Sequence, residues 1–251
     1  HIVASSLSIL SIINGLIFKV FYKCKLTFEI RDVWPLVLVE NASFSRLNPF
    51  VKMLGLIEWL GYRFSDHIAA TMPNLETHVY NTLGFKKKVT CIPMGISDEL
   101  LKSEYNLENN ILFPQDKFII SYVGSIGTDN ALDIFFEAAE KLKHEENIIF
   151  KVFGKGDLLD HYIEKFSSCN NIHFEGYIDN KLVQTVLKKS SVLYFAAHPT
   201  KVLEYGQSLN KVIDYMYSGR PIIASFTGYQ SMINESNCGV FLPADDKNLL
   251  T

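Results

Sequence analysis

A lysine and a carboxylate lie three residues apart near the start of a predicted helix. Residues 208–225 read SLNKVIDYMYSGRPIIAS. This run predicts a helix with Ser208 as its N-cap and Gly219 as its stop, followed by a buried strand. The spacing places Lys211 and Asp214 on one face of that helix. A helix that begins in a glycine-containing loop offers free backbone N–H groups to an anion, and we expect phosphate there. An ordinary strand and helix with surface charges would give the same pattern.

A second group of possible phosphate donors follows another predicted strand. Residues 123–130 read VGSIGTDN, which is a glycine loop between a strand and a helix. In such a loop the hydroxyl groups of Ser125 and Thr128 and the backbone N–H groups of Gly124 and Gly127 can donate to phosphate oxygens. A tight turn that binds nothing is the alternative interpretation.

Aromatic and charged residues end two further predicted strands. Tyr177 and Ile178 follow Gly176, and an aromatic face can stack on a nucleobase while the neighbouring backbone binds the edge of that base. Packing in the core is the alternative for both side chains. Arg31 and Asp32 end a strand in the first half of the chain. They could bind a substrate or hold their own loop through a salt bridge.

The composition and the motifs indicate neither metal chemistry nor nucleic-acid binding. None of the seven histidines has metal-ligand spacing, and the chain has no Asp-x-Asp motif and no Ser-His-Asp order. We therefore expect no metal and no cofactor. The net charge of −3 lacks the basic excess that suits nucleic acid. The four cysteines are scattered, which favours reduced thiols in a cytoplasmic protein over a zinc site or disulfides.

The elements that must position these residues follow from the hydrophobic pattern. Short β-rich runs alternate with amphipathic helical runs, which predicts an α/β protein with parallel sheets covered by helices on both faces. We expect strands at residues 2–4, 26–30, 68–70, 89–92, 118–123, 148–153, 172–175, 192–195, 221–224 and 240–242. We expect helices at residues 7–22, 47–64, 75–83, 132–143, 158–166, 181–188, 209–218 and 229–234.

Two doubly wound, Rossmann-like domains result from this pattern. Residues 97–115 are polar and lack a clear period, so we place the linker there. The domains then comprise residues 1–105 and residues 106–251. In such sheets ligands bind outside the carboxyl ends of the strands, and here we expect that edge to face an interdomain cleft.

Residues 7–21 are apolar enough to suggest a membrane span. Asn14, Lys19 and two serines interrupt them, whereas a span needs about 20 nearly unbroken apolar residues. We therefore predict a core helix and a protein that is peripheral to the membrane. The chain begins at His1 in a strand-like run and ends where a new helix is expected to start. From this we expect the N-terminal domain and the C-terminal end to be incomplete.

Six motifs, in order along nearly the whole chain, resemble the retaining glycosyltransferases of family four, which have the GT-B fold. Residues 210–225, NKVIDYMYSGRPIIAS, resemble the donor-binding signature of this family. The most similar variety builds bacterial O-antigen, capsule and colanic-acid repeats on a lipid carrier. The other motifs are RDVWP at 31–35, IPMGI at 92–96, VGSIG at 123–127, VFGKGD at 152–157 and IHFEGYI at 172–178.

The resemblance implies roles for the residues of the second half. Asp214 matches the carboxylate that binds the ribose of the donor. Lys211 would act as a catalytic residue that stabilises the leaving diphosphate without a metal, and Asn210 would add amide donors. Tyr177 and Ile178 lie where the family receives the nucleobase.

The chain departs from the family pattern in two places. Gly206 replaces the first of two acidic residues that hold the donor sugar, and Glu204 lies two residues earlier. We therefore expect contacts to the reacting sugar from the loop at Gly206 and Ser208, with Glu204 as a weaker candidate. Ser125 and Asn130 stand where many relatives carry a basic pair that binds the diphosphate.

The resemblance also implies an activity. It is the transfer, with retention, of a hexose or N-acetylhexosamine from a nucleotide-diphosphate sugar, with UDP preferred. The acceptor would be a saccharide on polyprenyl diphosphate at the inner face of the cytoplasmic membrane. Residues 1–105 would bind it, with Arg31 and Asp32 on the acceptor side, and residues 106–251 would bind the donor. Two alternatives remain: a UDP-sugar epimerase of the same architecture, and a fragment that binds nucleotide-sugar without turnover.

Overall fold

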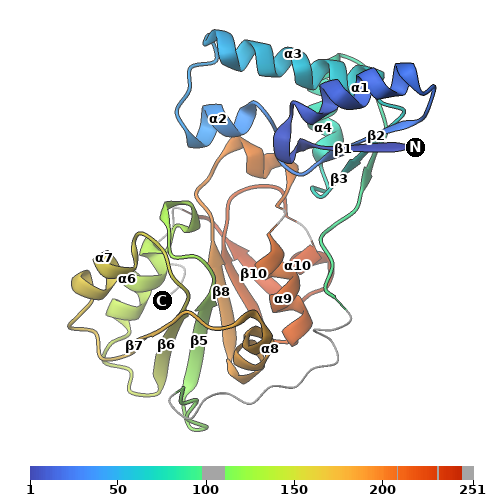
Figure 1. Ribbon diagram of the computed structural model, residues 1–251. Helices are drawn as coiled ribbons and strands as arrows, with labels where there is room; N and C mark the ends of the chain where they lie inside the picture. The colour runs from blue at the N-terminus through green and yellow to red at the C-terminus, as the bar shows by residue number, and fades with distance from the viewer. Residues whose placement is uncertain (98–110, 208, 231, 245–251) are drawn as a thin grey trace. The chain divides into compact units, whose positions relative to one another are not determined.

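The computed structural model describes residues 1–97, 111–207, 209–230 and 232–244 (Figure 1). The chain divides into two compact units. The first comprises His1–Met94 and Thr200–Ser208, and the second comprises Gly95–Pro199 and Leu209–Thr251. Each unit contains one parallel sheet with helices, so the predicted α/β fold class is confirmed.

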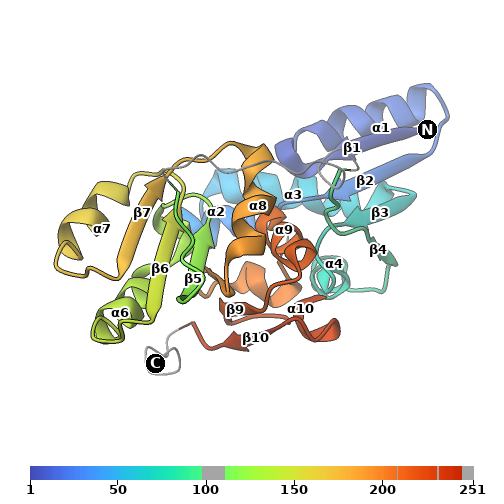
Figure 2. The same ribbon diagram turned by 90° about the horizontal axis from the view of Figure 1, so that it is seen from below.

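The sheet of the first unit is four-stranded and parallel, in the order β1-β2-β3-β4 (Figure 2). Its core is formed by buried apolar side chains such as Leu26, Phe28 and Ile30, which alternate along β2 with less buried residues. The strands are β1 (Ile2–Ser5), β2 (Leu26–Ile30), β3 (His67–Ala70) and β4 (Val89–Cys91). The helices are η1 (Ser6–Ser8), α1 (Ser11–Phe21), α2 (Leu36–Asn41), α3 (Pro49–Phe64), α4 (Leu75–Leu83) and η3 (Lys201–Tyr205).

Helix α1 packs on this sheet through a narrow face. Ile12 and Gly15 are its buried residues, and a Cβ added to Gly15 would lie 3.0 Å from Leu26 Cδ1. The predicted burial of the apolar face is therefore correct for only part of the helix, because Val20 and Phe21 are 76% and 79% exposed. Within the described residues, none of the helices combines the length and the apolar character that a membrane span requires.

The sheet of the second unit is six-stranded and parallel, in the order β10-β9-β8-β5-β6-β7. The order reverses between β5 and β8, as expected for a doubly wound sheet. Its strands are β5 (Phe118–Val123), β6 (Ile148–Phe153), β7 (Ile172–Gly176), β8 (Val192–Ala196), β9 (Ile222–Ser225) and β10 (Gly239–Leu242). Its helices are η2 (Thr128–Asn130), α6 (Asp133–Lys141), α7 (Leu159–Lys165), α8 (Asn180–Lys189), α9 (Asn210–Ser218) and α10 (Met232–Glu235).

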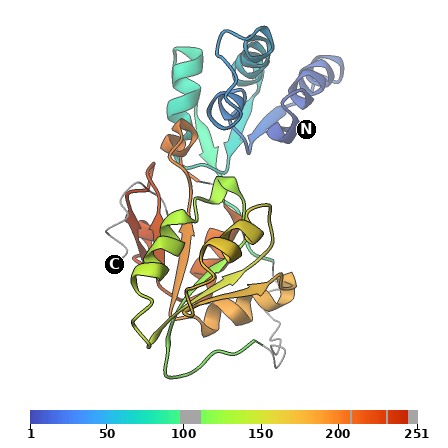
Figure 3. The same ribbon diagram turned by 90° about the vertical axis from the view of Figure 1, so that its left-hand side faces the viewer.

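Aromatic side chains fill the core between this sheet and the helices α6 and α7, which lie in front of the sheet in Figure 3. Phe136 of α6 has its ring centroid 4.3 Å from that of Tyr162 and 5.3 Å from that of Phe166. Phe135 packs in the same way between Phe150 and Tyr194. Because buried aromatic residues remove large apolar areas from water, this cluster fixes the helices against the sheet.

The boundary between the units differs from the predicted division at residues 105 and 106. The second unit begins at Gly95, and residues 200–208 group with the first unit. The reason is a set of contacts across more than a hundred residues of sequence. Asn74 donates from its backbone N–H to the carbonyl of Tyr205 (2.9 Å) and from its side chain to the carbonyl of Glu204 (3.0 Å), and the ring of Tyr205 lies 4.9 Å from that of His78.

The start of α9 also differs from the prediction. Leu209, with extended backbone dihedrals, precedes the helix, and it forms no side-chain capping bond. Ser208, the predicted N-cap, lies outside the described residues. The predicted stop is confirmed, because Gly219 ends the helix in the left-handed conformation with φ 71°.

Candidate functional site

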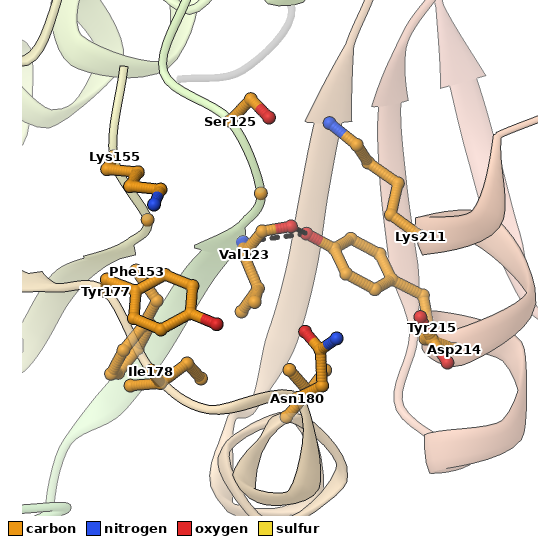
Figure 4. Close-up of a pocket in the computed structure, with 13 residues that line it drawn as sticks. Val123, Ser125, Phe153, Lys155, Tyr177, Ile178, Asn180, Lys211, Asp214 and Tyr215 are labelled. Carbon is orange, nitrogen blue, oxygen red and sulfur yellow. Dashed lines mark hydrogen bonds between the residues drawn. The ribbon is translucent and has the colours of Figure 1, made fainter.

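A pocket of about 260 Å³ opens in the second unit where β5, β6 and β7 end (Figure 4). The side chains of Lys155 and Tyr177 enter it from one side, those of Lys211 and Tyr215 from the other, and that of Asn180 from the start of α8. The carboxyl edge of a parallel sheet beside a reversal of strand order is where ligands bind in this class of fold. The lining residues are Val123, Gly124, Ser125, Phe153, Gly154, Lys155, Tyr177, Ile178, Asn180, Val183, Lys211, Asp214 and Tyr215.

Tyr215 anchors α9 in the split between β5 and β8. These strands pair only at Ile120 and Ser121, so the backbone of Val123 has no partner in β8. The Tyr215 hydroxyl accepts from the Val123 N–H at 2.8 Å and lies 3.1 Å from the Val123 carbonyl oxygen and 3.3 Å from that of Tyr194. One side chain thus replaces the missing strand pairing and holds α9 beside the end of β5.

The loops after β5 and β6 approach so closely that glycine is required. Gly154 has φ 148°, and a Cβ at this position would lie 1.8 Å from the carbonyl oxygen of Gly124. The Gly124 N–H donates to the carbonyl of Phe153 (3.0 Å), and the Gly154 N–H donates to that of Gly176 (2.8 Å). The three strand ends therefore form one continuous floor of backbone for the pocket.

Lys211 holds a half-buried ammonium group over the loop after β5. Its Nζ donates to Asn130 Oδ1 (2.7 Å) and to Tyr122 Oη (3.0 Å). A Cβ added to Gly124 would lie 3.0 Å from the same nitrogen, so glycine leaves the room that the lysine occupies. Burial lowers the pKa of Lys211 from its usual value to about 8.

Asp214 lies one turn further along α9 and lines the same pocket. Burial raises the pKa of its carboxyl group, and the neighbouring Gln184 acts in the opposite direction. The side chain of Gln184 also donates to the backbone carbonyl of Asp214 at 3.0 Å. Among the described residues that line the pocket, Asp214 is the single carboxylate, and it lies on the same helix as Lys211.

Tyr177 provides an aromatic surface at the opposite side of the pocket. Its side chain is 62% exposed, and the Lys155 ammonium lies 4.9 Å from the centroid of its ring. Ile178 is buried, with its side chain as part of the apolar lining. An exposed ring that a cation already touches on one face can receive a second planar group.

Six of the predicted donor-side residues meet in this pocket: Gly124, Ser125, Tyr177, Ile178, Lys211 and Asp214. Gly127, Thr128 and Asn210 belong to the same unit but do not line it. Gly206 groups with the first unit, where a Cβ added to it would lie within 2.4 Å of Pro73 Cδ. Ser208 lies outside the described residues.

The sequence analysis did not select Lys155, Asn180 or Tyr215, nor the lysine partners Tyr122 and Asn130. Lys155 could have been found, because it follows a predicted strand and a glycine just as the loop after β5 does. Asn180 follows the next strand end in the same way. Tyr215 and Tyr122 read as core residues, and their hydroxyl contacts join positions far apart in the sequence.

Arg31 and Asp32, which were predicted to contact an acceptor, follow β2 in the first unit. Ser6 Oγ accepts from the backbone N–H groups of both residues (2.8 and 3.0 Å) and donates to the Asp32 carbonyl (3.0 Å). Ser6 therefore holds this loop through its backbone. The described residues show no ion pair between Arg31 and Asp32, which removes the predicted salt bridge. A role of either side chain toward a substrate stays a prediction.

The described residues also contain a second, shallow pocket of about 400 Å³ in the first unit, around Asn74 and Tyr80 of the α4 region. Arg31 and Asp32 do not line it. No group of three or more histidine, cysteine, aspartate or glutamate side chains is arranged to hold a metal ion in the parts of the chain that the structure covers.

Solved structures with two such sheets resemble the chain. They include WaaG, a glycosyltransferase involved in lipopolysaccharide biosynthesis (TM-score 0.65, 15% identity, 93% of this chain and 68% of WaaG covered). HepE of Anabaena in complex with UDP gives a TM-score of 0.69 at 14% identity, with 97% and 65% covered. Sucrose-phosphate synthase of Thermosynechococcus elongatus gives 0.65 at 18% identity, with 96% and 60% covered. The chain thus has the GT-B fold and spans about two thirds of the length of these proteins.

A sequence comparison with functionally curated proteins gave no significant match. The sequence profile of the family described as "Glycosyl transferases group 1" matches residues 117–251. This match covers more than half of the chain and includes every residue that lines the pocket at the ends of β5, β6 and β7. The chain therefore belongs to the group 1 glycosyl transferases.

Proposed function

We propose that the chain is a glycosyltransferase that binds a nucleoside-diphosphate sugar in the pocket of its second unit. The observation that carries this proposal is the Lys211 ammonium, held over a glycine loop at the carboxyl ends of parallel strands. A fixed cation and free backbone N–H groups are what a diphosphate requires. HepE in complex with UDP and TarM in complex with UDP are among the similar structures, which supports UDP as the nucleotide.

The donor would lie across the pocket from Tyr177 to α9. In this arrangement Tyr177 and Ile178 receive the nucleobase, and Asp214 accepts hydrogen bonds from the ribose hydroxyl groups. Lys211 and the N-terminus of α9, including Asn210, bind the diphosphate. The loop after β5 approaches it from the other side with donors at Ser125, Gly127 and Thr128, whereas Gly124, whose N–H already donates to the Phe153 carbonyl, leaves room for the lysine.

Catalysis would depend on stabilising the leaving diphosphate. As the glycosidic bond breaks, negative charge develops on the diphosphate oxygens, and a preorganised cation in a buried site lowers the barrier to that step. Lys211 would supply the charge, and the loop at Gly206 and Ser208 would contact the sugar. We propose that the reaction needs no metal and retains the anomeric configuration, as in family four.

The acceptor would be a saccharide on polyprenyl diphosphate, bound by the first unit with Arg31 and Asp32 nearby. The protein would then work as a peripheral protein at the inner face of the cytoplasmic membrane, in O-antigen or capsule synthesis. Exposed apolar residues at the end of α1, Val20 and Phe21, followed by Lys23 and Lys25, support such a contact. High-salt washes should release the protein from membranes, whereas release by detergent alone would contradict a peripheral location.

One experiment tests the activity against its alternatives. The protein is incubated with labelled nucleotide-sugars, with and without polyprenyl-diphosphate-linked saccharides, and with or without EDTA. We expect label in the lipid fraction, equally with EDTA, and NMR of the product should show the anomeric configuration of the donor. Epimerised nucleotide-sugar would indicate the epimerase. Binding without conversion under all conditions would indicate a binding fragment.

A further inference from the structure

Lys211 is half-buried, and its ammonium has no counter-ion in the described part of the chain. Its two hydrogen-bond acceptors, Asn130 Oδ1 and Tyr122 Oη, are uncharged. None of the ion pairs formed by residues 1–97, 111–207, 209–230 and 232–244 includes Lys211. Withdrawing a charge from water is costly, and such charges in proteins are normally paired. An anion bound in the pocket would supply a partner for this ammonium.

The hydrogen bonds of this lysine leave one donor for such an anion. An ammonium carries three N–H donors and no acceptor. Two of these N–H groups donate to Asn130 and Tyr122. The third N–H has no acceptor within the residues that the structure describes. The nitrogen lies among the residues that line the pocket at the end of β5. A ligand oxygen in that pocket can therefore complete its coordination.

Tyr122 has a hydroxyl group whose role is fixed by its second contact. The side chain is fully buried, and its hydroxyl donates to the carbonyl oxygen of Ser125 at 2.5 Å. Since the single hydroxyl proton is used there, the oxygen can only accept from Lys211. The lysine, the tyrosine and the loop after β5 thus form one chain of hydrogen bonds.

Asn130 holds the ammonium from the other end of the same loop. It ends η2, and its backbone N–H donates to the carbonyl of Gly127 at 3.1 Å. An amide oxygen accepts a hydrogen bond without neutralising the cation, whereas an aspartate of nearly the same shape would add a competing negative charge. The residue type at this position therefore decides how much of the lysine charge a ligand experiences.

We propose that Tyr122 and Asn130 are positioning residues that hold the Lys211 ammonium by neutral contacts, so that its charge remains available to the diphosphate of the donor. The inference rests on the proposed function, because it requires a diphosphate in this pocket. A positioning role differs from a purely structural role in one respect. The absence of charge on Asn130, and not only its shape, should affect binding of the diphosphate.

The test compares Tyr122→Phe, Asn130→Ala and Asn130→Asp by calorimetry of the full chain with UDP, uridine and inorganic pyrophosphate. Each of the first two changes removes one of the two contacts that position the ammonium and should weaken UDP and pyrophosphate about 2- to 12-fold, which corresponds to about 0.5–1.5 kcal/mol. Asn130→Asp should weaken both more than Asn130→Ala does, although it keeps the acceptor. Uridine binding should change little in all three variants.

Two matched controls separate these effects from general damage. Tyr162→Phe removes the hydroxyl of another buried tyrosine in the same core, which contacts Asp133. Asn234→Asp on α10 adds the same charge at a residue that does not line the pocket. Both should bind UDP as the unchanged protein does. If Tyr122→Phe fails to fold, the two Asn130 variants still test the proposal, because Asn130 lies on a partly exposed turn.

The pH dependence provides a second measurement. Removing the Tyr122 oxygen takes an acceptor from the charged form of Lys211, so the pH at which UDP affinity begins to fall should move lower in Tyr122→Phe. Equal losses for UDP and uridine, or an Asn130→Asp variant that binds like the unchanged protein, would overturn the positioning role. Pyrophosphate binding without UDP binding would instead contradict the proposed donor. Binding of neither ligand would reject both proposals.

Discussion

At the level of single residues, α9 presents a cation and an anion to the same pocket, and the proposed donor gives them different tasks. Lys211 faces the loop after β5, whereas Asp214 lies one turn later beside Gln184. Because uridine has a ribose but no phosphate, it distinguishes between the two side chains. The pair can therefore be tested with two ligands and two substitutions.

Lys211→Ala is expected to weaken UDP much more than uridine, and Asp214→Asn should weaken both ligands to a similar extent. A charge-assisted hydrogen bond is worth about 1.5–3 kcal/mol, which corresponds to roughly ten- to a hundredfold in affinity. Calorimetry with both ligands measures the ratios. Ser236→Ala, a change on the surface after α10, serves as the control. Equal losses for UDP and uridine in both variants would reject the assigned roles.

The lowered pKa of Lys211 gives opposite pH trends for ligand binding and for stability. The folded protein holds this pKa at about 8, below the usual value of 10.5, because burial disfavours the charge. Above pH 8 the lysine loses its proton, so UDP affinity should fall between pH 8 and pH 9. In the window from about 8 to 10.5 the unfolded chain binds more protons, so this residue makes folding more favourable as the pH rises.

Calorimetry at several pH values and denaturant unfolding over the same range measure the two trends. Lys211→Met removes the titrating group and should flatten both. Uridine affinity, which does not involve the ammonium, should stay level from pH 7 to pH 9. A UDP affinity that is constant over this range would show that Lys211 does not bind the diphosphate as a cation.

At the level of elements, the ends of β5 and β6 meet at two glycines. Gly154→Ala is expected to destabilise the protein and to abolish UDP binding, because the new Cβ would lie 1.8 Å from the backbone oxygen of Gly124. Backbone strain of this kind costs about 1–3 kcal/mol, and separating the two strand ends adds to it.

Gly219→Ala is the matched control, since Gly219 also has positive φ but has nothing within 4 Å of an added Cβ. Its cost should stay near 1–2 kcal/mol, with UDP binding unchanged. Urea unfolding and calorimetry compare the two variants. Equal losses of stability and of UDP affinity would show that the close approach of Gly154 to Gly124 does not matter.

The elements themselves could largely be predicted, because period and composition act locally. The expected bounds of β2, α4, β5 and β6 are those of the structure. Helix α2 was missed, since its six residues form an apolar run too short to show a helical period. The pocket could be predicted only where it follows from strand ends. The sequence analysis did not predict Tyr122, Asn130 and Tyr215 as site residues, because their hydrogen bonds to Lys211 and Val123 span about 80 to 90 residues.

At the level of the whole molecule, the order of residues along the chain differs from their grouping in space. Residues 200–208 interrupt the second unit and fold with the first, where Val202 and Tyr205 pack against its core. No local pattern predicts this grouping, because its partners are distant in sequence. Asn74 lies just before α4, and His78 lies within it. The family match to residues 117–251 likewise runs through the segment without a break.

A fragment that begins at residue 111, shortly before the family match, should therefore be poorly soluble. In residues 111–251 alone, Val202 and Tyr205 lose their core and expose apolar area to water at about 25 cal/mol per Å². Replacing residues 200–208 by a glycine-serine linker should give a monomer that binds UDP without added metal. Size-exclusion chromatography and calorimetry compare the two fragments. A soluble, equally stable natural fragment would show that the segment is not bound to the first unit.

The lowered pKa of Lys211 also has a consequence for the chemical reactivity of its amine. An ordinary lysine, with a pKa near 10.4, is well under about 1% free amine at pH 8, whereas Lys211 is roughly half free amine there. Burial also lowers the pKa of Lys87, whose ammonium donates to the carbonyl of Ser65. A limiting dose of an acylating reagent at pH 8 should therefore modify Lys211 before ordinary surface lysines, and UDP should protect it. Lys87 does not line the pocket, so its modification should be the same with and without UDP. A uridine derivative with an amine-reactive group would then attach covalently inside the pocket.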